Sequence, residues 1–318
     1  MWKERQAELL RDELEALLVS LSEAADLYDL VKEPLTRRRQ GLASESAANR
    51  LWPLLPLIVC EAIAGRYEHA LPVAASLQLF VAAGDVFDDI EDADSSESLS
   101  ARYGSAVATN VATTLLILAE GAITRLKGRG VEDYVAIRVM DAVNSFYTTA
   151  CSGQHLDLSL TSQVAVSEDV YLRIAAMKSA STVECACYIG ALLATANQEL
   201  IETFALFGHN LGMASQIAND ILGITRGSDI VKHKITLPVI YALTQTEGEV
   251  RNQLELAFSK QAGKSVPYPA QIRELLFRSG AVHYATVKME FYKQRALDIL
   301  PEVERAGAAV ERLKLFLE

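Results

Sequence analysis

Apolar residues recur three and four positions apart along almost the whole chain, which is the spacing that lines one face of an α-helix. Leucines show this spacing through residues 3–30, and no run alternates apolar and polar residues as a half-buried strand would. The other segments with helical spacing are 47–64, 71–92, 107–126, 131–158, 167–197, 199–225, 247–262, 269–280 and 282–316, with a further helix expected from Ile235 onward. The pattern predicts an all-α fold, a single bundle of long and mostly antiparallel helices.

Residues that begin or end helices stand between these segments. Pro34 is expected to close the first helix, and Ser167 to cap a later one. Gly128 and Gly130 leave only a short turn between two long segments, which we therefore expect to pack antiparallel. The eight prolines are not gathered into a linker, and no Gly/Ser-rich stretch occurs. The sequence predicts that residues 1–318 form one domain.

One stretch interrupts the apolar pattern with acidic residues. Across residues 85–94, six of ten side chains are carboxylates, directly after a run of Ala, Val and Leu. On a helix, Asp85, Asp88, Asp89 and Asp92 share one face, and such a ladder of like charges needs a cation to hold it together. Carboxylates without Cys or His suit Mg²⁺, which prefers a site that it shares with substrate phosphates. Acidic runs are more often solvated helix ends, but the apolar lead-in favours a metal site here.

A second set of polar residues lies in the later half of the chain. Gln216, Asn219 and Asp220 share one face of an apolar helix, and Asn and Asp can both ligate Mg²⁺ through oxygen. Several charged residues could accompany them, namely Lys178 in an apolar stretch and the cluster Asp229, Lys232, His233 and Lys234. Lysines near carboxylate-bound metal indicate a bound anion such as a diphosphate. Each feature alone is weak, since a lone lysine is more often a surface residue.

Composition narrows the classes of partner. The chain has 318 residues, 50% of them hydrophobic, and a formal net charge of −11, which disfavours nucleic acid as a partner. Its four cysteines form no CxxC pair and are typical of reduced thiols in a cytoplasmic protein. The charged N-terminal residues are unlike a signal peptide, and no stretch reaches the roughly 18 uncharged apolar residues of a membrane span. We therefore expect no transmembrane segment and a cytoplasmic location.

Five motifs resemble those of the trans-isoprenyl diphosphate synthases, in the order of that family. Residues 88–92, Asp-Asp-Ile-Glu-Asp, resemble its first aspartate-rich motif, DDxxD. The others are 153–157 (resembling GQxxD), Tyr171 to Ser179 (resembling Y…KT), 216–223 at the place of the second aspartate-rich motif, and Asp229 with 234–238 (KITLP). The resemblance covers roughly residues 45–245. It implies the isoprenoid synthase fold, a helical bundle around a central apolar cavity, and a homodimer.

The resemblance also implies roles for individual residues. Its metal ligands would be Asp88, Asp89, Asp92, Asn219 and Asp220, which hold three Mg²⁺ together with the diphosphate of an allylic prenyl substrate. Its substrate-binding residues would be Arg50, Ala83, Gly84, Gln154, Lys178, Asp229 and Lys234. Its catalytic residues would be Lys178, Gln216 and Lys234. Metals and lysines in this family stabilise the leaving diphosphate as the C–O bond breaks, which leaves an allylic carbocation in a water-poor pocket.

Three departures from the family concern a second anion site, the one that binds isopentenyl diphosphate in members that elongate their substrate. Asn49 stands in place of a family Lys, and Val81 in place of a family His. The Arg pair after the first motif is absent, and the next arginine is Arg102. Loss of several cationic partners should lower the affinity for isopentenyl diphosphate by orders of magnitude.

The second aspartate-rich motif is also altered. Asn219 and Gly223 stand where the family usually has Asp, and the Asn-Ser/Thr-Glu triad of terpene cyclases fails at Gly223 and Gly227. An intact first motif with a reduced second one is similar to the bacterial prenyltransferases that modify a Trp of a pheromone peptide. It is equally similar to cyclases that arose on this fold, and the sequence does not separate the two.

Three hypotheses follow for the function. The favoured one is Mg²⁺-dependent ionisation of an allylic diphosphate of fifteen carbons or more, with the cation captured by its own double bonds or by a foreign acceptor. The second is elongation with isopentenyl diphosphate, through a site rebuilt from Arg50, Arg102 and the run 37–39. The third is a non-catalytic subunit of an active synthase, which would have no need of the acidic ladder.

The expected substrate length rests on two small residues. Ala83 and Gly84 lie five and four positions before Asp88, where the resemblance implies that bulky aromatics floor the pocket for short substrates. Two small residues would leave the pocket deep, with Leu79 and Phe80 as candidate floor, and each buried methylene contributes about 0.8 kcal/mol. The alternative is that Ala83 and Gly84 only permit close helix packing.

Overall fold

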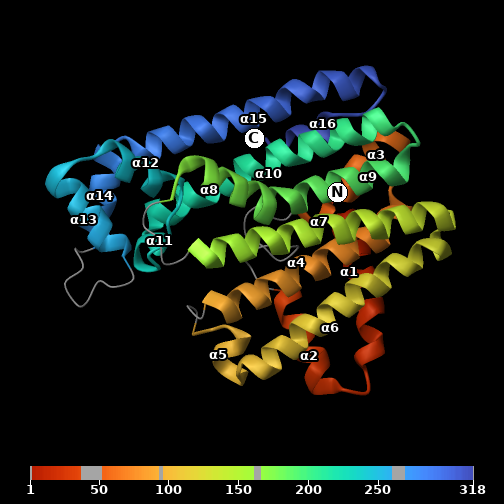
Figure 1. The fold of residues 1–318 in the computed structure, drawn as a ribbon. Helices are drawn as coiled ribbons and strands as arrows, with labels where there is room; N and C mark the ends of the chain where they lie inside the picture. The colour runs from red at the N-terminus through yellow and green to blue at the C-terminus, as the bar shows by residue number, and fades with distance from the viewer. Residues whose placement is uncertain (1, 37–51, 93–95, 161–165, 260–268, 318) are drawn as a thin grey trace. The chain divides into compact units, whose positions relative to one another are not determined.

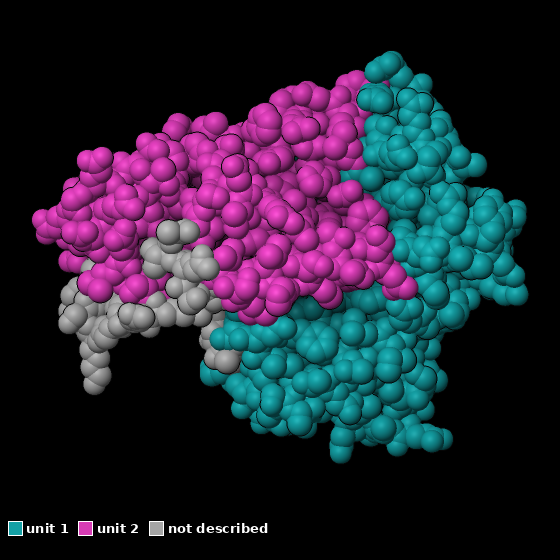
Figure 2. All heavy atoms as spheres, in the orientation of Figure 1, with its two compact units in different colours: residues 1–143, 186–205, 302–318 teal, residues 144–185, 206–301 magenta. Residues whose placement is uncertain are grey.

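The computed structural model describes residues 2–36, 52–92, 96–160, 166–259 and 269–317. Within them every regular element is a helix, which confirms the predicted all-α class (Figure 1). The chain divides into two compact units, coloured in Figure 2: unit 1 comprises residues 1–143, 186–205 and 302–318, and unit 2 comprises residues 144–185 and 206–301. The one-domain reading of residues 1–318 stays a prediction.

The chain passes between the units inside four helices. They are α7 (Asp133–Leu160), α9 (Ser181–Ala194), α10 (Gln198–Arg226) and α15 (Ala281–Arg305). Each unit is therefore assembled from stretches that are far apart in the sequence.

Unit 1 is organised around α4 (Leu71–Asp92), which is buried along most of its length because apolar residues fill its first thirteen positions almost without interruption. The helices of unit 1 that contact α4 are α1 (Trp2–Leu18), α2 (Ala25–Thr36), α3 (Leu55–Ala64), α5 (Leu99–Tyr103) and α6 (Ser105–Thr124). Buried alanines line α6 at positions 108, 112, 119 and 122, so α4 and α6 can approach closely. The short α16 (Glu311–Lys314) packs on α3.

Among its described residues, unit 2 has five α-helices of its own: α8 (Glu168–Ala175), α11 (Ser228–Val231), α12 (Leu237–Gln245), α13 (Gly248–Phe258) and α14 (Pro269–Arg278). One hydrophobic cluster joins the end of α10 to α12, α13 and α14 through residues such as Ile224, Val239 and Leu276. A second cluster joins α8, α10 and α12 through Tyr171, Ile217 and Ile240.

The predicted helices are found in the described residues, with corrections to several bounds. The predicted helix 47–64 is an α-helix only from Leu55, after a 3₁₀ turn at Trp52–Leu54. Residues 47–51 of that prediction, and 260–262 of the predicted helix 247–262, lie outside the described residues. Residues 3–30 form two helices separated by a 3₁₀ turn at Val19–Leu21, and Pro34 lies inside α2 and does not close the segment. Pro34 has no N–H to donate to the carbonyl of residue 30, and α2 continues for only two residues beyond it. The predicted helix 282–316 ends at Arg305, since Gly307 has a φ of +96°, a conformation that favours glycine.

Two helical stretches, Glu68–Asp92 and Ser105–Arg129, are long and apolar enough to cross a membrane by length and composition, contrary to the expectation that no stretch would be. Of their most apolar windows, 78% of the first and 39% of the second are buried inside the structure. Buried core helices meet the same criterion, so the two stretches are weak evidence for a membrane span.

Candidate active site

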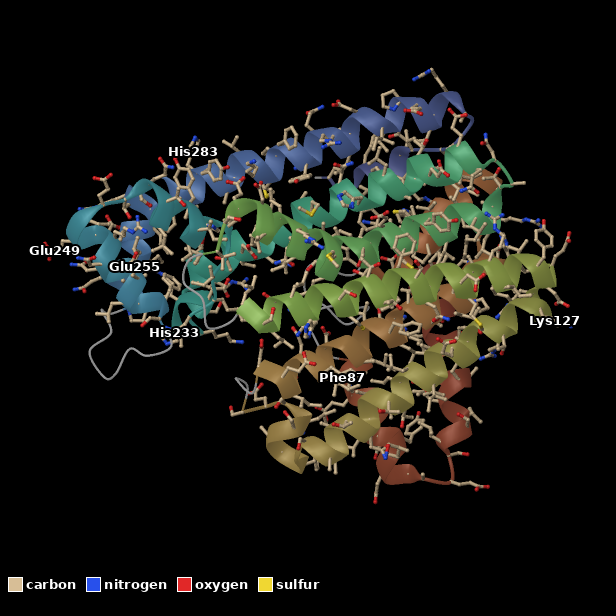
Figure 3. All side chains as sticks on the ribbon, in the orientation of Figure 1. Phe87, Lys127, His233, Glu249, Glu255 and His283 are labelled. Carbon is tan, nitrogen blue, oxygen red and sulfur yellow. The ribbon has the colours of Figure 1, made fainter. Side chains whose placement is uncertain are left out.

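The acidic ladder lies at the C-terminal end of α4, in unit 1. Phe87, labelled in Figure 3, marks this end of the helix. Asp88 and Asp89 are half-buried and Asp92 is exposed. The hydroxyl of Ser100 donates to the backbone carbonyl of Asp89 at 3.3 Å, which ties α5 to the ladder. A helix C-terminus carries a partial negative charge, so these carboxylates stand where the dipole also disfavours them, and a cation would relieve both effects.

The donor set fits a shared magnesium site better than a protein cage. Among the described residues, no group of three or more His, Cys, Asp or Glu side chains is placed so that it could hold a metal ion by itself. Mg²⁺ commonly takes only one or two carboxylates from a protein and completes its six ligands with water and substrate phosphates. The half-buried and exposed carboxylates of the ladder suit that mode of binding.

In unit 2, Lys178 lies in a π-helical turn, Ala176–Ala180, between α8 and α9. Two glycines allow neighbouring helices to approach the backbone of this turn. A Cβ at Gly153 of α7 would stand 2.5 Å from the backbone nitrogen of Lys178, and one at Gly212 of α10 would stand 2.7 Å from the Ala180 Cα. Such turns occur mostly as single interruptions of α-helices and are frequent at functional sites.

The ammonium of Lys178 is held by a residue of the GQxxD-like motif. Its Nζ lies 2.9 Å from Oδ2 of Asp157, and the two side chains are 29% and 50% exposed. Gln154 is half-buried one turn earlier on the same face of α7. The lysine is therefore directed toward the motif residues, and its ion pair is open to solvent.

Asp220 is enclosed by protein donors. Its side chain is 4% exposed and accepts hydrogen bonds from the Tyr171 hydroxyl at 2.5 Å, the Gln216 side-chain amide at 2.8 Å and the Leu237 backbone at 3.3 Å. Burial raises the pKa of Asp220 to about 6, against the opposing effect of these hydrogen bonds. Its role as a metal ligand stays a prediction and would require release of these donors, whereas the neighbouring Asn219 is exposed.

The catalytic candidate Gln216 is fixed from both sides. Besides donating to Asp220, it accepts a hydrogen bond from the Ser179 hydroxyl at 2.7 Å. Ser179 directly follows Lys178 in the π-helical turn, so one chain of hydrogen bonds links that turn to α10. Unit 2 thus links the turn that carries Lys178 to Gln216 and Asp220, and the roles of the three residues stay predictions.

The segment with Asp229 and Lys234 forms a tight loop between α10 and α12. The Lys234 backbone donates to the Asp229 carbonyl at 2.9 Å. His233 adopts a φ of +53°, and its Nδ1 lies 2.6 Å from the carbonyl oxygen of Ala257 on α13 (Figure 3). A non-glycine residue in this left-handed region is held there by its surroundings. The two candidate substrate-binding residues therefore belong to one ordered loop.

The candidate pocket residues have different environments. Gly84 is exposed, and a Cβ there would meet nothing within 4 Å. Ala83 is fully buried inside unit 1, which favours the packing explanation for that residue. Arg50, the remaining substrate-binding candidate, lies outside the described residues, as do Asn49 and the run 37–39.

One polar cluster had no signal in the sequence. The hydroxyl of Tyr284 on α15 donates to Glu168 of α8 at 2.6 Å, and Nζ of Lys288 lies 2.8 Å from the same carboxylate. These residues are more than 110 positions apart. Asp157 and Ser179, by contrast, lie in the recognised motifs, but their partners were not predicted.

Comparison with known proteins places this geometry among prenyl-transferring enzymes. The sequence model of the family described as Polyprenyl synthetase matches residues 42–274. The geranylgeranyl diphosphate synthase of Mycobacterium tuberculosis is 29% identical over 276 residues, which cover 84% of this chain and 79% of that protein. The tryptophan prenyltransferase ComQ of Bacillus subtilis is 26% identical over 250 residues, covering 78% of this chain and 80% of that one.

A solved structure shares the fold. It is a geranylgeranyl pyrophosphate synthase from Corynebacterium glutamicum, complexed with isoprenyl diphosphate and magnesium. The TM-score is 0.78 at 22% sequence identity, with 93% of this chain and 92% of that one covered. Together with the family match, this likeness establishes the fold of the chain.

Proposed function

The chain belongs to the polyprenyl synthetase family, and from that premise we propose that it ionises an allylic prenyl diphosphate and passes the prenyl cation to a partner other than isopentenyl diphosphate. The partner is either a double bond of the same prenyl chain, which gives a cyclic terpene, or a separate acceptor molecule. Membership in a family of enzymes argues against a non-catalytic subunit.

The choice of partner rests on one observation: the acidic ladder is intact while the cationic side chains of the second anion site are replaced. Val81 supplies no charge at the family's histidine position. Arg102, which might rebuild the site, forms an ion pair with Glu33 and stacks over Tyr103 at 5.1 Å. Both contacts hold the guanidinium against Glu33 of α2 and the neighbouring Tyr103, so Arg102 would have to leave them before it could join a rebuilt anion site.

The residues of the proposed site divide the work. When bound, Mg²⁺ neutralises the diphosphate and makes it a better leaving group. Lys178 donates to a phosphate oxygen of the substrate, and its ion pair with Asp157 holds the ammonium in place before the substrate arrives. Lys234, in the ordered loop, supplies a second cation. Gln216 keeps the π-helical turn in register with α10 through Ser179.

The relatives support the proposal in different ways. The Bacillus subtilis relative is a tryptophan prenyltransferase, which favours transfer to a separate acceptor such as an indole ring. The Mycobacterium tuberculosis relative is a geranylgeranyl diphosphate synthase, which favours the second candidate, elongation with isopentenyl diphosphate. Dependence on Mg²⁺, a cytoplasmic location and a homodimer belong to the proposal as well.

One assay separates these candidates. The purified protein is incubated with Mg²⁺ and geranyl, farnesyl or geranylgeranyl diphosphate, each alone, with isopentenyl diphosphate and with a tryptophan-containing peptide. We expect released diphosphate together with either a cyclic hydrocarbon or a prenylated peptide, and no longer prenyl diphosphate. Efficient formation of an elongated product would replace the proposal with the second candidate.

A further inference from the structure

The reduced second motif is accompanied by an unusual contact on α10. Gly223 is buried, and a Cβ on it would collide with the side chain of Asp229. Both carboxylate oxygens and the carboxyl carbon of Asp229 lie within 2.5 Å of the point where that Cβ would stand. In an aspartate the carboxylate oxygens lie about 2.4 Å from their own Cβ. The oxygens of the Asp229 carboxylate therefore lie about as far from that point as those of an aspartate at residue 223 would.

The chain is folded to hold this arrangement. Gly227 has a φ of +82° and ends α10, so that the chain reverses directly into α11. The hydroxyl of Ser228 lies 3.3 Å from both the Gly223 carbonyl oxygen and Oδ1 of Asp229. The Lys234 backbone then donates to the Asp229 carbonyl at 2.9 Å. Asp229 is thus fixed through its side chain and its backbone.

Burial and two lysines act on the Asp229 carboxylate in opposite directions. Burial raises the pKa of Asp229, while the ammonium groups of Lys234 and Lys232 act in the opposite direction. An anion beside two cations and an exposed amide is a suitable partner for a metal-bound diphosphate. Asn219 supplies that amide, because it is exposed and lies one helical turn before residue 223 on the same face.

We infer that Asp229 replaces the missing carboxylate of the second acidic motif and, with Asn219, offers oxygen ligands to the Mg²⁺ of the diphosphate complex. This inference rests on the proposed function and makes its second metal-binding set specific. In this chain the carboxylate of the motif comes from a residue six positions later. The absence of a side chain at Gly223 leaves room for it. Hard oxygen donors of this kind match the preference of Mg²⁺.

The test measures binding of Mg²⁺ with inorganic diphosphate, by titration calorimetry and by the shift in melting temperature, so it needs no knowledge of the product. Asp229→Asn removes the charge with little change of shape, and Gly223→Ala displaces the carboxylate without touching it. We expect each to weaken binding by at least about ten- to a hundredfold, which is the usual effect of losing a group that supports a metal ligand. The double variant Gly223→Asp/Asp229→Ala should recover most of the affinity, because it returns the carboxylate to the same place on its own helix.

Matched controls make the same chemical changes elsewhere. Asp169→Asn alters an exposed aspartate of α8, and Gly121→Ala adds a Cβ that meets nothing within 4 Å. Both should bind as the wild type does. Wild-type affinity in Asp229→Asn or Gly223→Ala would overturn the inference, as would a folded double variant that binds no better than Asp229→Asn, or a wild type that binds no Mg²⁺ with diphosphate.

The two proposals can fail separately. If the variants behave as expected but no allylic diphosphate is consumed, the proposed function is wrong and the binding role of Asp229 stands. If the protein turns over an allylic diphosphate while Asp229→Asn binds Mg²⁺ with diphosphate as the wild type does, only the role of Asp229 is wrong.

Discussion

The carboxylates of the proposed site have opposite electrostatic surroundings at the end of α4 and at Asp220. Asp88, Asp89 and Asp92 repel one another and also face the negative end of the helix dipole. Asp220 has the opposite arrangement, since three donors stabilise one buried carboxylate. The ladder thus concentrates negative charge at the end of a helix, whereas Asp220 organises its surroundings.

The ladder yields the first prediction. Asp88→Asn and Asp89→Asn should each lower kcat by about two powers of ten or more, because a bound metal contributes several kcal/mol to the reaction. Their melting temperatures in EDTA should equal or exceed that of the wild type, because repulsion is relieved. Asp141→Asn, at an exposed position of α7, is the control and should change neither quantity. Near-full turnover of the ladder variants would contradict the assignment.

A second prediction concerns pH and His69. Burial lowers the pKa of His69 from its ordinary value of 6.5, and its Nε2 lies 3.2 Å from Sγ of Cys60 and 3.3 Å from the Leu193 carbonyl oxygen. The folded protein therefore binds fewer protons than the unfolded chain as the pH falls below about 6.5, so stability declines in that window. His69→Gln should show a shallower decline of the unfolding free energy below pH 6.5.

The measurement for His69 is urea denaturation in a series of buffers from neutral to mildly acidic pH. His283→Gln, at an exposed position of α15 labelled in Figure 3, serves as the control and should follow the wild-type curve. Parallel curves for wild type and His69→Gln would show that this histidine does not link stability to pH.

At the scale of elements, α4 combines a buried half with an end that carries the ladder. Its two small residues before Asp88 differ, because Ala83 is buried and Gly84 is exposed. Gly84→Phe should therefore shift preference toward shorter allylic diphosphates with little loss of stability, since phenylalanine has a higher helix propensity than glycine. Ala83→Phe should instead lower the unfolding free energy by about 1–3 kcal/mol, the usual effect of overpacking a core.

Both α4 variants are compared by product length under competition between farnesyl and geranylgeranyl diphosphate, and by denaturation. If Gly84→Phe leaves the preference unchanged while Ala83→Phe remains stable and shifts it, the pocket follows the Ala83 side of the helix, and the role assigned to Gly84 is wrong.

At the scale of the whole molecule, unit 1 exposes two large isoleucine side chains. Ile117 of α6 is 66% exposed, and Ile137 of α7 is 62% exposed. Large exposed apolar side chains can mark an association surface. We propose that a second copy of the chain covers them in a homodimer.

The prediction for assembly is that Ile117→Glu lowers the molar mass measured by light scattering from that of a dimer to that of a monomer. Val287→Glu places the same charge on α15 at a 54% exposed valine and should leave the dimer intact. A wild type that is monomeric across the micromolar range, or an Ile117→Glu variant that stays dimeric, would rule out this surface.

The sequence by itself determined the helices, the family and the acidic ladder, because each of these depends on residues that are close together in the chain. Helical spacing marks a buried face over a few turns, and the motifs keep a fixed order and spacing. The sequence predicted two helix ends wrongly. The helix that contains Pro34 continues beyond this proline, and the last long helix ends before Gly307.

Only the tertiary structure decided which polar side chains meet. Neither the π-helical turn at Lys178 nor its packing against Gly153 can be read from periodicity, because both arise where separate helices approach. The enclosure of Asp220 requires Tyr171, which lies 49 positions away. Asp229 fills the space beside Gly223 because the backbone turns at Gly227. A motif search along the sequence shows only that Gly223 lacks the carboxylate of the family motif. Such pairings are set by the packing of whole helices, which spacing along the chain does not encode.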